Sequence, residues 1–212
     1  MKTKVLLIGA ALGLAVATAS ADAVYSSNVV GYVNVDLVAG WNMIANPLDT
    51  GNNTLSNVIP TAPYNTAVVK FVDGAYTSPA IFDEDEEDWY FTGEEFDVNP
   101  GEGIFVNAPE AFTVTFVGEV KAGTHSVPLP AGWSMVASPT PVAGDLNEIG
   151  LTSAVEFNDA AIPYVNGVGF GPTALYDEDE EDWMNNFNVA VGQAFFLKKA
   201  NASTWTRTFE IK

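Results

Sequence analysis

The sequence contains no cysteine, a single histidine and few basic residues. The absence of cysteine excludes disulfide stabilisation, a thiol nucleophile and the Cys/His spacings of zinc sites. Eight Lys and Arg residues stand against 27 Asp and Glu residues, which gives a formal net charge of −19 at pH 7. Such a chain is repelled by nucleic acid and by anionic membrane surfaces, so its natural partners are cations.

The first 23 residues follow the three-part pattern of a secretory signal peptide. Lys2 and Lys4 provide the positive start, and an apolar run over residues 5–16 follows. That run is short for a membrane span. Small residues at 19–21 or 21–23 fit the cleavage site. We predict an exported protein that is extracellular, at the cell surface or in the periplasm, without a membrane span after cleavage; the alternative is an uncleaved anchor.

Similar segments occur twice along the chain, in the same order and with a nearly constant offset in residue number. The matched pairs are VDLVAGWNMIANP (35–47) with VPLPAGWSMVASP (127–139), FVDGAY (71–76) with YVNGVGF (164–170), and VNPGEGIFV (98–106) with VAVGQAFFL (189–197). A repeat of this length indicates an internal duplication. We therefore predict a first repeat over residues 24–118 and a second over residues 119–212.

Each repeat has the pattern of a β protein. Apolar and polar residues alternate in the segments 30–37 and 67–72, and β-branched and aromatic residues are abundant. Asp73-Gly74 and Asn166-Gly167 occupy matching places and are typical of tight hairpin turns. The expected fold class is all-β, with two homologous small β-sandwich or barrel units packed together.

The motif AGW-x-M-[IV]-A-x-P, followed later by G-x-[GA]-[IF]-F-[VL], resembles a duplicated β module of secreted bacterial proteins. In that module a GWN-[LM]-I…P strand precedes a G-x-GYW-V strand. The lead-in NVVGYVNVDLVAGWNMIANPL is similar to secreted proteins of Verrucomicrobia and related bacteria. This chain has Ile104-Phe105 and Phe195-Phe196 where the module commonly has Tyr-Trp. The resemblance implies the fold and export, and it implies no activity.

Two identical acidic runs are the most unusual feature of the sequence. DEDEEDW occurs at 83–89 and again at 177–183. Clustered carboxylates repel each other unless a cation neutralises them, and Ca²⁺ accepts six to eight oxygen ligands in irregular loops. The predicted Ca²⁺ ligands are Asp83, Asp85, Glu87, Asp88, Asp177, Asp179, Glu181 and Asp182. The alternative is a pair of solvated loops that keep the protein soluble.

The tryptophans suggest a second kind of site. Trp41 and Trp133 lie in alternating strands and are expected in the core, whereas Trp89 and Trp183 adjoin the acidic runs and are expected to be partly exposed. An exposed aromatic ring beside polar groups can stack on a sugar ring. Trp89 and Trp183 are therefore candidate ligand-binding residues, and binding of surface glycans is the alternative function.

Catalysis has little support in the sequence. His125, the only histidine, lies in the connection between the repeats, and phosphate-loop and dinucleotide motifs are missing. With 27 acidic residues, a pair of carboxylates suited to glycoside hydrolysis has no diagnostic value. The favoured function is a non-enzymatic structural or adhesive surface protein. Its N-terminal strand, near 29–37, either pairs within its own chain or adds to a neighbouring copy to form a filament.

Overall fold

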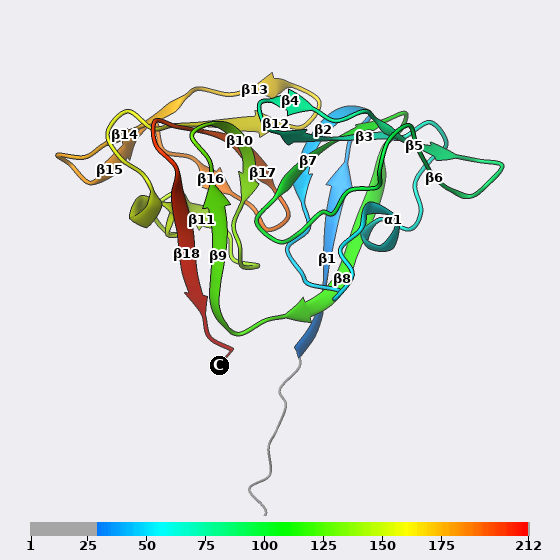
Figure 1. Cartoon of the computed structure of the whole chain (residues 1–212), viewed down its shortest axis with the longest axis horizontal. Coiled ribbons are helices and arrows are strands. Elements are labelled where there is room, and N and C mark those ends of the chain that lie inside the picture. Colours follow the sequence, from blue (N-terminus) through cyan, green and yellow to red (C-terminus); the bar gives the residue numbers. More distant parts are fainter. Residues whose placement is uncertain (1–28, 212) are drawn as a thin grey trace, which may run out of the picture.

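The structure is a computed structural model that describes residues 29–211, so the predicted signal peptide, residues 1–23, lies outside the described chain. The described chain is built almost entirely of antiparallel strands (Figure 1). Its helices are two single turns, α1 (Leu55–Val58) and the 3₁₀ turn η1 (Leu151–Ala154), and neither could cross a bilayer. The prediction of an all-β fold is confirmed.

The two halves of the chain have the same topology. In each half, a two-stranded ribbon accompanies a six-stranded sheet: β1-β8 with the order β2-β7-β3-β5-β6, and β9-β18 with the order β10-β17-β12-β14-β15. The sixth strands, β4 and β13, pair with β3 and β12 to form matching hairpins. The internal duplication is therefore confirmed as two copies of one β unit.

The strands of the first half are β1 (Val29–Leu37), β2 (Gly40–Ala45), β3 (Ala67–Val72), β4 (Ala75–Tyr76), β5 (Ala80–Asp83), β6 (Asp88–Phe91), β7 (Gly103–Ala108) and β8 (Phe112–Val120). Those of the second half are β9 (Gly123–Leu129), β10 (Gly132–Ala137), β11 (Gly144–Asp145), β12 (Ala160–Val165), β13 (Gly169–Phe170), β14 (Ala174–Asp177), β15 (Asp182–Met184), β16 (Asn188–Val189), β17 (Ala194–Lys199) and β18 (Ser203–Phe209).

The N-terminal strand is paired within its own chain. β1 pairs with β8 along its whole length, from Val29 opposite Val120 to Leu37 opposite Phe112. The predicted boundary between residues 118 and 119 therefore falls inside β8, and the connection between the units lies slightly later, between β8 and β9. Of the two arrangements considered for this strand, the structure has the intramolecular one.

Each half has a core between its ribbon and the inner face of its sheet. Because side chains alternate along a strand, Ile44 of β2 points into this core while Met43 points to the outer face. Phe116 of β8 and Trp205 of β18 fill the two cores from the ribbons and are 1% and 0% exposed. The outer faces also carry apolar side chains, so each central strand is apolar on both sides.

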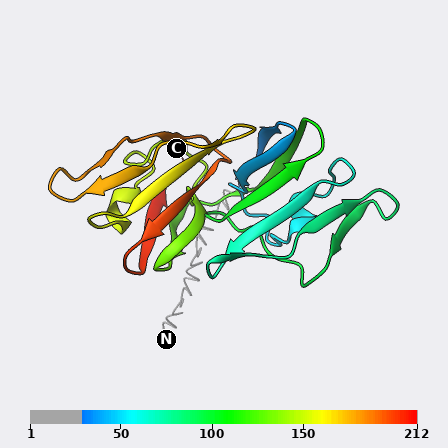
Figure 2. The same cartoon turned by 90° about the horizontal axis from the view of Figure 1, so that it is seen from above.

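The halves lie side by side (Figure 2) and meet through reciprocal contacts. The Ala45 N–H donates to the Gly192 carbonyl at 2.9 Å, and the Ala137 N–H donates to the Gly101 carbonyl at 3.0 Å. Ala45 corresponds to Ala137 in the repeat, and Gly101 corresponds to Gly192. The contact is thus an internal version of the self-complementary interface of a two-fold dimer.

Glycine is required where the halves approach each other. Gly192 has φ +80°, and a Cβ added there would lie 2.5 Å from Cγ2 of Val35 in the first half. Gly101 has φ +94° and stands in the same relation to Val127, at an even closer approach. Both the positive φ and the lack of space exclude a side chain at these positions.

We expect the substitution Gly192→Ala to lower the free energy of unfolding more than Gly51→Ala does. Gly51 has φ +79° with no atom within 4 Å of an added Cβ. Both changes impose the backbone strain of about 1 kcal/mol, but Gly192→Ala adds overpacking against Val35 of about 1–3 kcal/mol. Urea unfolding of the two variants measures the difference. Equal losses would show that the halves do not pack this closely.

Candidate functional site

The outer surface shared by the two sheets carries a continuous cluster of aromatic side chains, here called the aromatic face. Its members are Trp41, Phe71, Tyr76, Phe105, Trp133, Tyr164, Phe170 and Phe196. Two close contacts cross from one half to the other: the ring centroids of Phe105 and Tyr164 are 4.9 Å apart, and those of Phe71 and Phe196 are 5.2 Å apart. Both pairs meet edge to face, the preferred geometry for aromatic rings. The aromatic face is therefore a single surface built by both units.

Much of the aromatic face is open to solvent. The side chains with the largest exposed fractions are Phe170 at 58%, Tyr76 at 52%, Trp41 at 42% and Trp133 at 40%. Phe105 and Phe196, which lie beneath them, are 6% and 7% exposed. The exposed rings thus rest on a buried aromatic layer that fixes their positions.

Strand alternation explains why these residues lie outside. Trp41 and Met43 share one side of β2, and Ile44 lies on the other side, in the inner core. Met43 is covered by the second half, whereas Trp41, two residues nearer the start of the strand, is beyond that cover and half exposed. The expectation that Trp41 and Trp133 belong to the core is therefore wrong.

The expectation that Trp89 and Trp183 are partly exposed is also wrong, because both side chains are buried. Trp89 and Trp183 are 6% and 3% exposed. The Trp89 Nε1–H donates to the Ile59 carbonyl at 2.7 Å, and its ring lies 5.4 Å from that of Phe82. These side chains point inward because they alternate with exposed neighbours in short strands. A ring buried to this extent offers no face on which a sugar could stack.

Two apolar grooves open on the aromatic face. The larger, of about 400 Å³, is lined by Trp41, Val69, Tyr76, Phe105, Tyr164 and Phe170. The smaller, of about 240 Å³, is lined by Phe71, Trp133, Ile162, Phe170 and Phe196. The repeat relates the lining residues of the two grooves, as Trp41 corresponds to Trp133 and Phe105 to Phe196. Rings of the opposite half also line each groove: Tyr164 and Phe170 in the larger, and Phe71 in the smaller.

The grooves contain few polar groups. Burial and the nearby Tyr164 raise the pKa of Tyr76, so this phenol stays neutral and can only donate or accept a hydrogen bond. The Nζ atom of Lys198 lies 5.8 Å from the centre of the Trp133 ring, within the range of a cation–π interaction. Asn107 takes the equivalent place beside Trp41, across the β2-β7 ladder. This chemistry suits binding by apolar contact and stacking.

The acidic runs form the turns of two equivalent hairpins, here called the acidic turns (residues 83–88 and 177–182). Asp83 pairs with Asp88 across β5-β6, and Asp177 pairs with Asp182 across β14-β15. Asp83 Oδ1 accepts the Asp85 N–H at 2.8 Å, so one carboxylate of the run stabilises the turn itself. The two hairpins extend at opposite ends of the long axis of the molecule (Figure 1).

The predicted Ca²⁺ ligands are brought to these turns but do not converge. Within residues 29–211 there is no group of three or more Asp, Glu or His side chains arranged to hold a metal ion. Instead, Asp182 accepts hydrogen bonds from Asn147 Nδ2 and the Trp183 N–H, both at 2.7 Å. These two bonds lower the pKa of Asp182. Ca²⁺ binding by the acidic turns stays a prediction.

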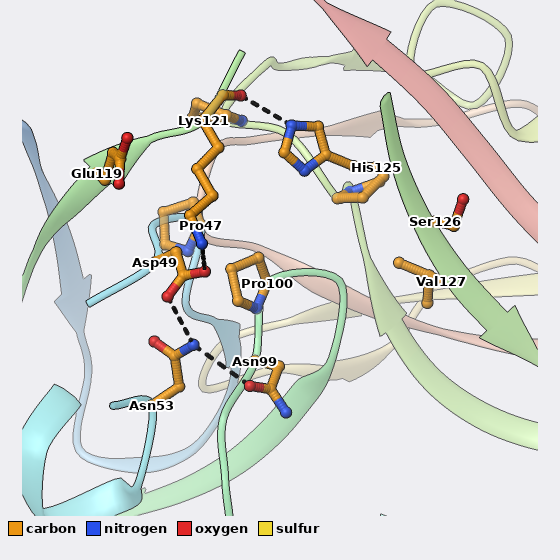
Figure 3. A pocket seen from close by; sticks show the side chains of 12 residues that line it. Pro47, Asp49, Asn53, Asn99, Pro100, Glu119, Lys121, His125, Ser126 and Val127 are labelled. Atoms are coloured by element: carbon orange, nitrogen blue, oxygen red, sulfur yellow. Dashed lines mark hydrogen bonds and ion pairs between the residues drawn. The ribbon is translucent and has the colours of Figure 1, made fainter. Parts of the chain in front are cut away.

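A polar pocket of about 210 Å³ lies at the junction between the halves (Figure 3). Lys121 forms an ion pair with Asp49, and Asn53 Nδ2 donates to Asp49 at 3.1 Å. His125 Nε2 donates to the Lys121 carbonyl at 2.8 Å, while Ser126 bonds instead to Thr206 across the ribbon. Asp49, Lys121 and His125 thus bond to one another or to the backbone, and these bonds fix the connection between β8 and β9.

Sequence reasoning missed the aromatic face, although one signal for it was present. Phe71, Tyr76 and Phe105 each have an aromatic partner in the second repeat, Tyr164, Phe170 and Phe196. Both copies keep aromatic rings at these matching positions although the rest of their sequences has diverged. The rings also lie on strands that are apolar on both sides, and the two features together indicate a shared aromatic surface. Whether that surface is covered or open depends on how the copies pack, which the repeat alone does not specify.

The chain matches no family model, and comparisons with curated proteins and with solved structures find no similar protein. The resemblance to modules of secreted bacterial proteins therefore stays a prediction.

The ion pair in the polar pocket predicts a pH dependence of stability. The hydrogen bond from Lys121 lowers the pKa of Asp49, and the same bond raises the pKa of Lys121. The stabilisation by Asp49 is therefore complete above its unfolded pKa, near 4, and is lost as the pH falls through its lowered folded pKa. Lys121 keeps its charge up to a pKa above its usual range.

We expect Asp49→Asn to lower the free energy of unfolding by at most about 1 kcal/mol at pH 5–9, because the pair is partly exposed. The difference from the unsubstituted protein should vanish as the pH falls below about 3. Urea unfolding across this pH range measures it, with Glu110→Gln, an exposed carboxylate on the β7-β8 loop, as the control. If Asp49→Asn still lowered the free energy of unfolding by the same amount at pH 2, the stabilising role of the Asp49–Lys121 ion pair would be contradicted.

Proposed function

We propose that this chain is an exported, non-enzymatic structural or adhesive protein of the cell surface, extracellular space or periplasm, and that the aromatic face is its contact surface. The observation that carries the proposal is the exposure of Trp41, Tyr76, Trp133 and Phe170 in one continuous cluster. A soluble protein rarely leaves a large apolar patch uncovered unless the patch binds something.

The composition of the aromatic face supports a binding role. Tryptophan and tyrosine are enriched among the residues that dominate interface energies, because each covers a large area at little cost in conformational entropy. The exposed rings are also held in place by Phe105 and Phe196 beneath them. A surface fixed in this way loses little further freedom on binding, which favours affinity.

The double variant Trp41→Ala/Trp133→Ala should bind the cell envelope of the producing bacterium at least tenfold more weakly than the unsubstituted protein. Each lost ring should cost about 1–3 kcal/mol of binding free energy, and 1.4 kcal/mol is tenfold in affinity. Cosedimentation of the mature protein with envelope fragments provides the measurement. Tyr32→Ala is the matched control, since Tyr32 is 74% exposed on the β1-β8 ribbon. Unchanged retention of the double variant would refute the proposed contact surface.

Carbohydrate is the second candidate ligand, and the observation in its favour is the position of Trp41 and Trp133. Both rings are partly exposed and lie beside a side chain with hydrogen-bond donors, Asn107 and Lys198. In each pair the tryptophan ring could stack on a sugar ring while the neighbouring side chain donates a hydrogen bond to a sugar hydroxyl group. A glycan screen separates the candidates, because a carbohydrate-binding protein should show saturable affinity that disappears in Trp41→Ala/Trp133→Ala.

We further propose Ca²⁺ as the ion of the acidic turns, and expect Ca²⁺ to raise the melting temperature and EDTA to lower it. Ion at a hundred times its dissociation constant would add about 2.7 kcal/mol per independent site. The variant Asp85→Asn/Asp179→Asn removes two predicted ligands but keeps the backbone N–H groups that close the turns. It should lose most of the Ca²⁺ effect. An unchanged melting temperature, with no heat of Ca²⁺ binding by calorimetry, would leave the turns as solvated loops.

A further inference from the structure

We infer that the partner of the aromatic face is a protein segment that carries large apolar side chains flanked by Lys or Arg. This inference rests on the proposed function and names the chemistry of the partner. Three observations lead to it: the apolar lining of the grooves, the uncompensated negative charge of the chain, and the position of the acidic turns relative to the aromatic face.

The grooves fit apolar side chains better than sugars. Their lining is aromatic and aliphatic. Its side-chain polar groups are the Tyr76 and Tyr164 hydroxyls and the Trp41 indole N–H in the larger groove, and the Trp133 indole N–H in the smaller. A sugar seated there would leave most of its hydroxyl groups without partners, and burying an unpaired hydroxyl costs several kcal/mol. A Leu, Phe or Trp side chain has no such cost. Two grooves on one face suit a segment that presents two such side chains.

The charge of the chain calls for a cationic partner. The described chain has three ion pairs, in which Lys70, Lys121 and Lys199 are bound to Glu102, Asp49 and Asp159. None of these pairs includes a member of the acidic turns. The carboxylates at 84–87 and 178–181 are all exposed, so most of the charge of −19 is free to attract cations from outside.

The acidic turns lie at the two ends of the layer that holds the aromatic face. The β5-β6 and β14-β15 hairpins point away from each other along the long axis, and the β4 and β13 strands lie between them (Figures 1 and 2). A segment lying along this axis would place its apolar centre on the grooves and its ends near six carboxylates on each side. Charge at the rim guides the approach and selects the partner, while the apolar centre supplies the affinity.

Other occupants fit less well. A second copy would be another strongly acidic chain, of formal net charge −19, and in an aligned pair it would oppose acidic turns to acidic turns. The described chain begins with β1 at the end of the β1-β8 ribbon away from the β4 and β13 strands (Figure 1). A basic, apolar segment of another protein is the occupant that the charges favour.

Acrylamide quenching of tryptophan fluorescence tests the inference on the mature protein. Trp41 and Trp133 are half exposed, whereas Trp89, Trp183 and Trp205 are buried, so quenching reports on the aromatic face. The probe is a synthetic nine-residue peptide with Leu and Phe in the centre and two Lys at each end. A peptide with Glu in place of each Lys and a neutral oligosaccharide are the comparison ligands.

We expect the lysine peptide to protect the two tryptophans saturably, with affinity at least tenfold above that of the glutamate peptide and falling as salt is added. The variant Tyr76→Ala/Phe170→Ala should bind at least tenfold more weakly, and Tyr32→Ala should bind normally. Neutralising the acidic turns by Asp85→Asn, Glu86→Gln, Asp179→Asn and Glu180→Gln should weaken binding severalfold and flatten its salt dependence.

Equal affinity for the two peptides, protection by the oligosaccharide alone, or self-association in sedimentation at the same face would overturn the inference. Loss of envelope retention in Trp41→Ala/Trp133→Ala together with any of these results would leave the proposed function standing with a different partner. If that variant were instead fully retained on the envelope, the proposed function itself would be refuted. The comparison of the two peptides needs only the unsubstituted protein, so it holds even where a variant folds poorly.

Discussion

The reciprocal approach of the two halves is the constraint on which the aromatic face depends. The hydrogen bonds Ala45–Gly192 and Ala137–Gly101 fix the distance between the sheets, and the glycines allow it. Only at this distance do rings from opposite halves come into contact and line common grooves. Met43 and Met135, nearly fully buried between the halves, supply the apolar contact that the hydrogen bonds alone could not. The aromatic face is thus a product of the packing of the repeats, and neither half has it alone.

Repetition and alternation made most of the fold predictable from the sequence. The order of the matched segments predicted two copies, and the Asp73-Gly74 and Asn166-Gly167 turns predicted the β3-β4 and β12-β13 hairpins. The exposure of the tryptophans was not predictable in the same way. Trp41 lies on a strand that is apolar on both sides, so alternation separates the two sides without showing which of them the second unit covers.

The acidic runs show a related limit. Their place in hairpins follows from the flanking apolar residues, and the inward direction of Trp89 follows from alternation once the strand begins at Asp88. The sequence gives the number of carboxylates in each run. Ion binding depends instead on whether the carboxylate oxygens converge on one point. In the structure, Asp83 caps its own turn and Asp182 bonds to Asn147, which are local uses that charge density does not reveal.

The two-fold contact gives one chain the interface geometry of a homodimer. Within one chain a position has no identical symmetry mate, because a substitution appears only once in the molecule. The buried ion pair of Lys199 with Asp159 is such a departure from symmetry, since the equivalent residues in the first half are Ala108 and Thr66. The unequal grooves, of about 400 and 240 Å³, are a further departure from symmetry. A single chain with two related but distinct grooves can recognise an asymmetric ligand in one orientation, which a dimer of identical subunits could not do.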